Sequence, residues 1–129
     1  MINYRLDIAK KYLDDAVDLF ERNRFNSSAS RAYYASYQAM WAALGNPKDG
    51  KIWRHLAIIK HFVRGYWIKP DYSKKGPGLL ENNRLPLRRL YSYRIKSDYD
   101  GVNVDYHVLE QLVKVVKQII NIIEGKGDK

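Results

Sequence analysis

Apolar residues recur at intervals of three and four along the first part of the chain, with acidic residues between them. This spacing places the apolar side chains on one face of a helix and the acidic side chains on the opposite face. We therefore predict an amphipathic helix over residues 3–23. Its apolar face is made by Leu6, Ala9, Leu13, Ala16, Val17 and Phe20. Its opposite face carries Asp14, Asp15, Asp18 and Glu21.

A second helix is predicted from a cap at Asn26 or Ser27 to Leu44, because these residue types favour helix starts. One face alternates small and large side chains, which lets a neighbouring helix approach closely. That face consists of Ala29, Ala32, Tyr33, Ser36, Tyr37, Met40, Ala43 and Leu44. Tyr33 and Tyr37 are therefore expected to be buried in a helix–helix contact.

The adjacent face of this second helix carries Tyr34 and Trp41. Such wide apolar coverage is expected of a central bundle helix or of a dimer contact. The aromatic side chains could instead stack bases, but at this spacing core packing is favoured. Arg31 and Tyr34 are expected nearest to a polar cleft.

The remaining pattern predicts three further helices separated by glycine- and proline-rich turns. They cover residues 52–66, with Leu56, Ile59 and Val63 inward, a segment from Leu85-Pro86 onward, and residues 103–124. A long loop is predicted over 65–78. Because no segment alternates as a strand would, the sequence predicts an all-α, up-down bundle of four to five helices. Residues 1–124 form a single domain in this prediction, with a flexible tail at 125–129.

The composition predicts where in the cell the protein is found, and it shows an uneven distribution of charge along the chain. Cysteine is absent, and charged residues interrupt the first twenty positions, so we expect a cytoplasmic protein without a membrane segment. The formal charge is +9. Residues 51–96 hold twelve Lys or Arg but only two acidic residues, Asp71 and Glu81. This region could face nucleic acid, nucleotide phosphates or an acidic protein, or be a solvated basic surface.

Arg94 is the strongest single candidate for chemistry, because it falls on the apolar stripe that Leu87, Leu90 and Tyr91 form. A guanidinium in such a position requires a carboxylate, a phosphate or carbonyl groups as partners. An ion pair with Asp98 or with the first helix would explain it as well as phosphate binding does. For Arg31 too, an ion pair with an acidic residue of the first helix remains an alternative to phosphate binding.

The three histidines lack the spacing of metal ligands, so we expect neither a metal site nor a cofactor. His55 follows Arg54 near the start of a predicted helix, where both side chains could meet phosphate or water. His107 is expected to be exposed to solvent.

Three segments together resemble the HEPN domain family. They are "AKKYLDDAVDLFERNRFNSSASRAYYASYQAMWAAL" (9–44), "HLAIIKHFVRGYWI" (55–68) and "LPLRRLYSYRIKSDY" (85–99), and they cover nearly the whole chain in order. The resemblance implies an α-helical bundle, commonly a homodimer, in cytoplasmic prokaryotic proteins. It also implies association with a small nucleotidyltransferase or with toxin–antitoxin and other defence systems.

Many members of the family resemble metal-independent RNases whose site, at the dimer interface, uses an Arg followed after four to six residues by a His. Arg94 matches the arginine, but Tyr99, Asp100 and Gly101 stand where the histidine is expected. A tyrosine hydroxyl, with an ordinary pKa of about 10, is a poor base at pH 7, although it can donate a hydrogen bond to phosphate. The arginine could still stabilise charge on a reacting phosphate.

Three functions therefore remain open. The first is a module that binds RNA, a nucleotide or a nucleotidyltransferase. The second is an RNase with an atypical site of Arg94, Asp98 and Tyr99, to which His55 could contribute. The third is a structural dimer that binds an acidic protein. The candidate phosphate-binding residues are Arg31, Arg54, His55, Arg88, Arg89 and Lys96.

Overall fold

The computed structural model describes residues 4–68, 78–99 and 103–127, with the backbone alone at 97–99 and 126–127. This part of the chain is helical and contains no strand. Its elements are α1 (Tyr4–Glu21), α2 (Phe25–Leu44), α3 (His55–Val63), the short 3₁₀ helix η1 (Glu81–Asn83), α4 (Arg84–Tyr99) and α5 (Tyr106–Gly127). The predicted all-α class is confirmed.

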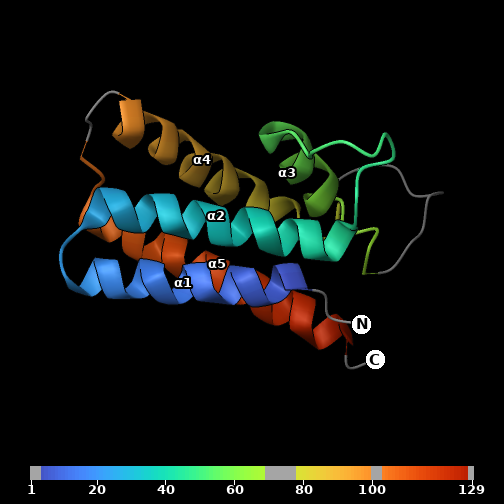
Figure 1. Cartoon of the computed structure of the whole chain (residues 1–129), viewed down its shortest axis with the longest axis horizontal. Helices are drawn as coiled ribbons and strands as arrows, with labels where there is room; N and C mark the ends of the chain where they lie inside the picture. Colours follow the sequence, from blue (N-terminus) through green and yellow to red (C-terminus); the bar gives the residue numbers. More distant parts are fainter. Residues whose placement is uncertain (1–3, 69–77, 100–102, 128–129) are drawn as a thin grey trace.

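The four long helices alternate in direction, and the short helix α3 lies beside α4 at one end of the bundle (Figure 1). Helix α2 packs against each of the other four α-helices. It is therefore the central helix of an up-down bundle, as its wide apolar coverage predicts.

Small side chains bring α1 and α2 close together. Ala9 and Ala16 of α1 and Ala29 and Ala32 of α2 are completely buried. Ser28 is also buried, and its hydroxyl donates to the carbonyl oxygen of Ala16 across the contact at 2.7 Å. Such an approach is possible because no long side chain separates the two backbones.

Large side chains of α2 fill the space on its other sides. Tyr33 is completely buried and Tyr37 nearly so, which confirms the predicted packing role of both. Helices α4 and α5 cover this region with Leu87 and Leu90 and with a buried stripe along α5. The α5 stripe consists of Leu109, Leu112, Val116, Ile119, Ile120 and Ile123, as its periodicity predicts.

Helix α3 is shorter than the predicted 52–66, and it buries Ile59 and Val63 as predicted but not Leu56. It ends at Val63, where Gly65 adopts a φ of 72°, a left-handed conformation that favours glycine. It packs through Ile58, Ile59, Phe62 and Val63. The predicted inward position of Leu56 is wrong: this residue is 51% exposed, and it lies in the first turn of the helix at the edge of the buried stripe.

The predicted start of α2 is also wrong. The helix begins at Phe25, and neither Asn26 nor Ser27 is its capping residue. The side-chain oxygen of Asn26 instead accepts a hydrogen bond of 2.9 Å from the backbone N–H of Val104, just before α5. Asn26 thus accepts a hydrogen bond from the backbone of a neighbouring segment rather than from the backbone of its own helix.

The other boundaries shift by a few residues. Helix α4 begins at Arg84, so Pro86 falls within its first turn, where proline is tolerated. Helix α5 begins after Asp105, whose carboxylate accepts from the N–H of Val108 at 3.0 Å, and continues to Gly127 rather than ending at 124. Among the described residues, no helix combines the length and apolar character needed to cross a membrane.

Truncation of Tyr33 tests the packing role of α2. We expect Tyr33→Ala to lower the free energy of unfolding by about 3–5 kcal/mol, because it removes a fully buried aromatic ring. Tyr33→Phe keeps the ring and should cost less, about 1–2 kcal/mol, because only the hydroxyl is removed. Urea unfolding at pH 7 measures both values. An unchanged midpoint for Tyr33→Ala would contradict the packing role.

Candidate functional site

Arg94 lies half-buried between α4 and α2. Its Nη2 atom donates a hydrogen bond of 2.7 Å to the hydroxyl oxygen of Tyr34. The guanidinium carbon is 5.2 Å from the centroid of the same ring. One tyrosine of α2 therefore holds this guanidinium both by a hydrogen bond and by its ring face.

His55, the first residue of α3, lies in a pocket of tyrosine rings. Its Nδ1 atom is hydrogen-bonded to the hydroxyl group of Tyr33. Tyr91 of α4 stacks on the imidazole with centroids 5.1 Å apart and an angle of 22° between the planes. The ring of Tyr37 lies 5.0 Å away. Side chains of α2 and α4 thus fix the position of this residue of α3.

Arg94 and His55 share one electrostatic environment. Burial lowers the pKa of His55 below its ordinary value, and the positive charge of Arg94 lowers it further. Burial also raises the pKa of the Tyr33 hydroxyl, an effect that Arg94 partly opposes. At pH 7 the imidazole is therefore neutral and the phenol protonated. We refer to Arg94, Tyr33, Tyr34, His55 and Tyr91 as the Arg94–His55 cluster.

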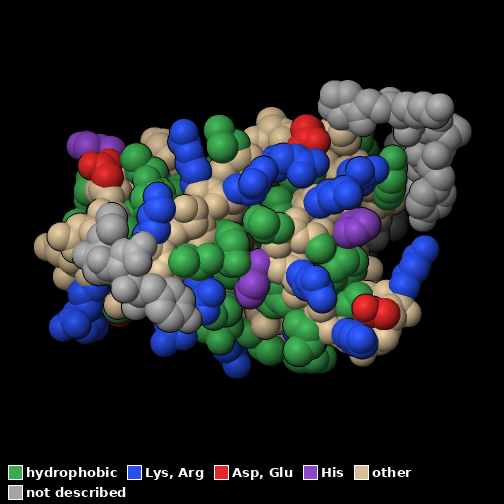
Figure 2. All heavy atoms as spheres, turned by 90° about the horizontal axis from the view of Figure 1, so that it is seen from above, with side chains coloured by type: hydrophobic (Ala, Val, Ile, Leu, Met, Phe, Trp, Pro, Cys, Tyr) green, Lys and Arg blue, Asp and Glu red, His purple; other side chains and the backbone are tan. Residues whose placement is uncertain are grey.

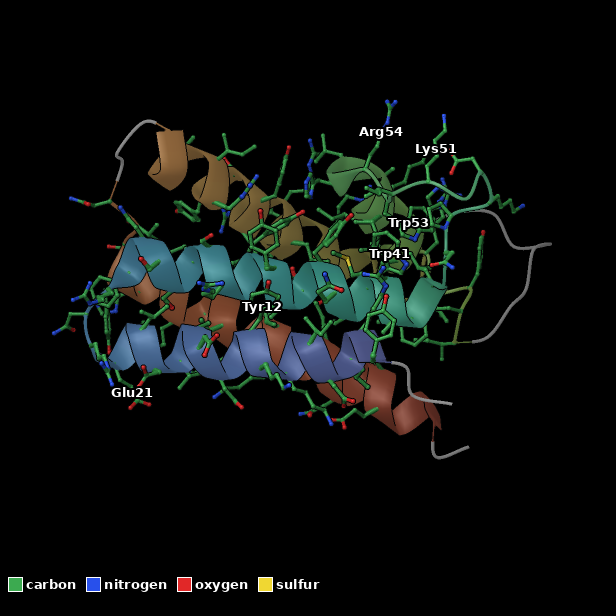
Figure 3. All side chains as sticks on the ribbon, viewed as in Figure 1. Tyr12, Glu21, Trp41, Lys51, Trp53 and Arg54 are labelled. Carbon is green, nitrogen blue, oxygen red and sulfur yellow. The ribbon has the colours of Figure 1, made fainter. Side chains whose placement is uncertain are left out.

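Arg31 lies on the other side of Tyr34. Its guanidinium carbon is 5.6 Å from the ring centroid of Tyr12 of α1, and the rings of Tyr12 and Tyr34 are 6.0 Å apart. Figure 3 shows Tyr12 between α1 and α2. Within the described residues Arg31 therefore contacts an aromatic ring of α1 and not an acidic side chain, so the ion-pair alternative is wrong.

The other candidate phosphate-binding side chains are exposed on α3, on α4 or just before α3. Arg54 precedes α3, and Arg88, Arg89 and Lys96 belong to α4. Figure 2 views the molecule from this side, and Lys and Arg side chains are spread over it among hydrophobic ones, with few acidic groups. These four residues and the Arg94–His55 cluster thus belong to the same side of the bundle.

Asp98 and Tyr99 lie in the last turn of α4, but their side chains are outside the described residues. Their predicted role beside Arg94, including an Arg94–Asp98 ion pair, therefore stays a prediction. His107 is exposed, as predicted.

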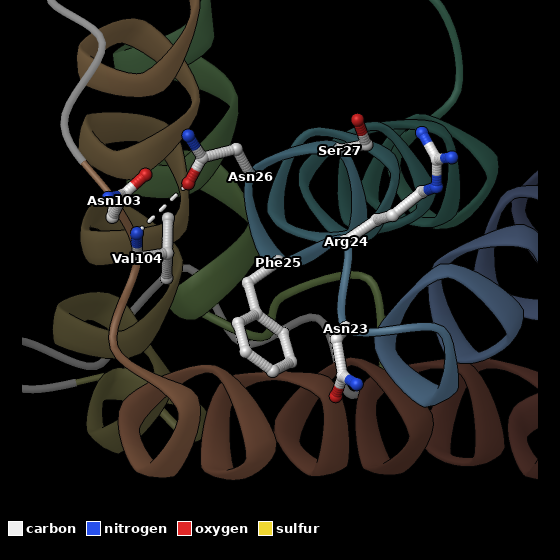
Figure 4. A pocket seen from close by; sticks show the side chains of 7 residues that line it. All are labelled: Asn23, Arg24, Phe25, Asn26, Ser27, Asn103 and Val104. Carbon is white, nitrogen blue, oxygen red and sulfur yellow. Dashed lines mark hydrogen bonds between the residues drawn. The ribbon is translucent and has the colours of Figure 1, made fainter.

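A polar pocket of about 440 Å³ lies around the start of α2, at the end of the bundle away from α3 (Figure 4). It is lined by residues 23–27, Asn103 and Val104. Arg24 is its one charged residue among the described lining residues, and none of the predicted site residues with a described side chain lines it. Within the described part of the chain, no group of three His, Asp or Glu side chains could hold a metal ion.

A scan against protein-family models matches the HEPN domain over residues 2–126. The chain belongs to the HEPN domain family. A search of curated proteins found no match. HEPN domains are all-α, in agreement with the bundle described above, and often form dimers.

Part of the site of this HEPN domain is not evident in its sequence. The hydrogen bond between Tyr33 and His55 joins residues 22 positions apart, and no spacing rule connects them. Tyr91 falls on the inward stripe of its helix, which is the one signal that it could contact a neighbouring group. The structure thus links Arg94, through Tyr34 and Tyr33, to a histidine of α3 and not to one in the sequence that follows Arg94.

The lowered pKa of His55 predicts a pH dependence of stability. The unfolded chain binds a proton as pH falls through about 6.5, whereas the folded protein resists protonation until lower pH. The free energy of unfolding should therefore decrease below about pH 6.5. His55→Phe, which keeps an aromatic ring, should make this decrease smaller.

Urea unfolding between about pH 5 and 7.5 measures this effect. His61 has a lowered pKa as well, so His61→Asn is the control and should remove its own, separate contribution. The same pH dependence in His55→Phe as in the wild type would contradict the assigned environment of His55.

Proposed function

We propose that this HEPN domain binds RNA across the exposed side of α3 and α4, next to the Arg94–His55 cluster. The observation that carries the proposal is the concentration of cations on this side. They are Arg54, Lys60, Arg64, Arg88, Arg89 and Lys96, all exposed.

Among the described residues, few acidic groups lie on this surface. In the described part of residues 51–96 the one acidic side chain is Glu81, which forms an ion pair with Arg84 over two hydrogen bonds, one of them 2.9 Å. Exposed ammonium and guanidinium groups without acidic neighbours attract a phosphate backbone and release its counterions. A nucleotide could use the same groups, with fewer contacts.

The cellular setting follows from the family resemblance. We propose that the protein acts in the cytoplasm as a homodimer, within a prokaryotic toxin–antitoxin or defence system that includes a small nucleotidyltransferase. This setting would supply RNA as a ligand for the basic surface.

Salt dependence tests the RNA-binding proposal. We expect wild-type affinity for a single-stranded RNA to fall steeply between roughly 50 and 200 mM salt. Replacing Arg88 and Arg89 by Ala should reduce the slope of log affinity against log salt by about 0.7 for each phosphate that the variant no longer neutralises. Fluorescence polarisation with an end-labelled oligonucleotide measures both.

A matched variant with Lys114→Ala and Lys117→Ala removes the same charge from exposed positions of α5. It should leave the slope nearly unchanged. Equal effects of the two double variants would mean that net charge alone attracts RNA and that α3 and α4 form no binding surface.

A metal-independent RNase is the second candidate, and the position of His55 beside Arg94 favours it. If Nδ1 donates its hydrogen to Tyr33, the Nε2 atom of the neutral imidazole can accept the proton of a 2′-hydroxyl group. Among the described residues no other hydrogen bond to His55 is found. Arg94 would stabilise the charge that develops on the phosphate, and Asp98 and Tyr99 could assist from the end of α4.

Cleavage in EDTA tests this candidate. Wild type should cut labelled single-stranded RNA, and Arg94→Ala and His55→Ala should each reduce the rate by about 10²-fold or more. Replacing Arg88 and Arg89 should weaken binding and leave the rate at saturating protein nearly unchanged. Intact RNA with every protein would exclude the nuclease and leave the binding proposal standing.

An acidic protein partner is a third candidate, favoured by apolar side chains among the cations. Ile52, Leu56 and Leu85 are 74%, 51% and 59% exposed. A complex that persists at high salt, together with no retention of RNA, would select this candidate.

A further inference from the structure

We infer that Trp53 and His61 form a stacking platform for an unpaired base of single-stranded RNA, beside the Arg94–His55 cluster. This inference rests on the proposed RNA binding and adds to it the form of RNA that is recognised. We call the two residues the Trp53–His61 platform.

The two rings lie together at the edge of α3. Their centroids are 5.4 Å apart, and their planes are inclined by 53°. Trp53 is half-buried and His61 is exposed, so part of the aromatic surface is open to solvent. Aromatic side chains with one accessible face are suited to stack a base, because every base has a π-face.

The tryptophan is held in place at both its ring and its backbone. Its Nε1 atom donates a hydrogen bond of 2.8 Å to the carbonyl oxygen of Gly45. Its own carbonyl oxygen accepts one of 2.6 Å from the hydroxyl of Tyr37. An incoming base would therefore meet a ring that is already oriented, which reduces the entropy lost on binding.

Cations flank both residues of the platform, because Arg54 follows Trp53 and Lys60 precedes His61 in the sequence. Burial lowers the pKa of His61, and Lys60, Arg64 and Lys48 lower it further, so these three cations act on the same ring. Lys51 and Arg54 point outward from the same end of the bundle (Figure 3). A phosphate next to a stacked base would thus have several cations within reach.

The platform is connected to the Arg94–His55 cluster. Trp53 and His55 are two residues apart, and Tyr37 contacts both, through its hydroxyl to the Trp53 carbonyl and through its ring to His55. One strand could therefore reach both places. The strand has to be single, because in a duplex the base faces are stacked on each other and cannot lie on a protein ring.

Two substitutions at Trp53 test the platform in the full-length protein. Trp53→Tyr keeps an aromatic ring, whereas Trp53→Leu keeps an apolar side chain without one. Both variants lose the indole N–H that donates to Gly45, so the loss of that group is common to the two. The ligands are a single-stranded RNA oligonucleotide and an abasic oligonucleotide of the same length and charge.

We expect Trp53→Leu to bind the RNA about 5- to 150-fold more weakly than Trp53→Tyr, which is the range for one stacked base. The two variants should bind the abasic strand equally. His61→Ala and His61→Phe form a second pair at an exposed position and should differ in the same direction. If Trp53→Leu does not fold, this second pair of variants tests the platform.

Other outcomes would overturn the inference in distinguishable ways. Equal RNA affinity within each pair, with salt-dependent binding by the wild type, would exclude the platform and leave the proposed function intact. No RNA binding by the wild type would overturn both. Equally tight binding of a poly-glutamate peptide that depends on the Trp53 ring would identify a protein-docking surface instead.

Discussion

Tyr33 is completely buried at the centre of α2, and its hydroxyl group needs a hydrogen-bond partner where water does not reach. His55 provides that partner from the first residue of α3. The bond fixes the start of the short helix α3 against the central helix. Because Tyr91 of α4 stacks on the same imidazole, the positions of α2, α3 and α4 depend on one another at this point.

This arrangement determines what the neighbouring groups can do. The imidazole is partly withdrawn from water and lies near the guanidinium of Arg94, so it stays neutral at pH 7 and contributes no positive charge. In the proposed function, anion binding would therefore be left to Arg94 and to the exposed cations of α3 and α4. The imidazole retains the two properties that do not require charge, which are acceptance of a proton and contact between ring faces.

The sequence predicted those features that depend on local periodicity. The α5 stripe and the burial of Tyr33 and Tyr37 follow from spacings of three and four residues, which helical geometry relates directly to a shared face. The sequence did not predict contacts between residues that lie far apart along the chain. Asn26 has the residue type of a cap for its own helix but bonds to Val104. Leu56 has the spacing of an inward residue, but it lies in the first turn of α3 and is exposed. The contact between His55 and Tyr33 likewise requires the folded arrangement.

The position of His55 changes how the absence of a histidine after Arg94 is interpreted. A motif search treats the arginine and histidine of this family as neighbours along the chain, and by that criterion Arg94 has no partner histidine. Chemistry requires only that the two groups be close in space. In the fold they are linked through two tyrosines, because Arg94 bonds to Tyr34 and the Tyr34 ring lies 5.6 Å from that of Tyr33, the hydrogen-bond partner of His55. Since the imidazole comes from a separate short helix, its position depends on the packing of α3 through Ile58, Ile59 and Phe62. Changes in that packing could therefore alter the site without touching either of its two polar groups.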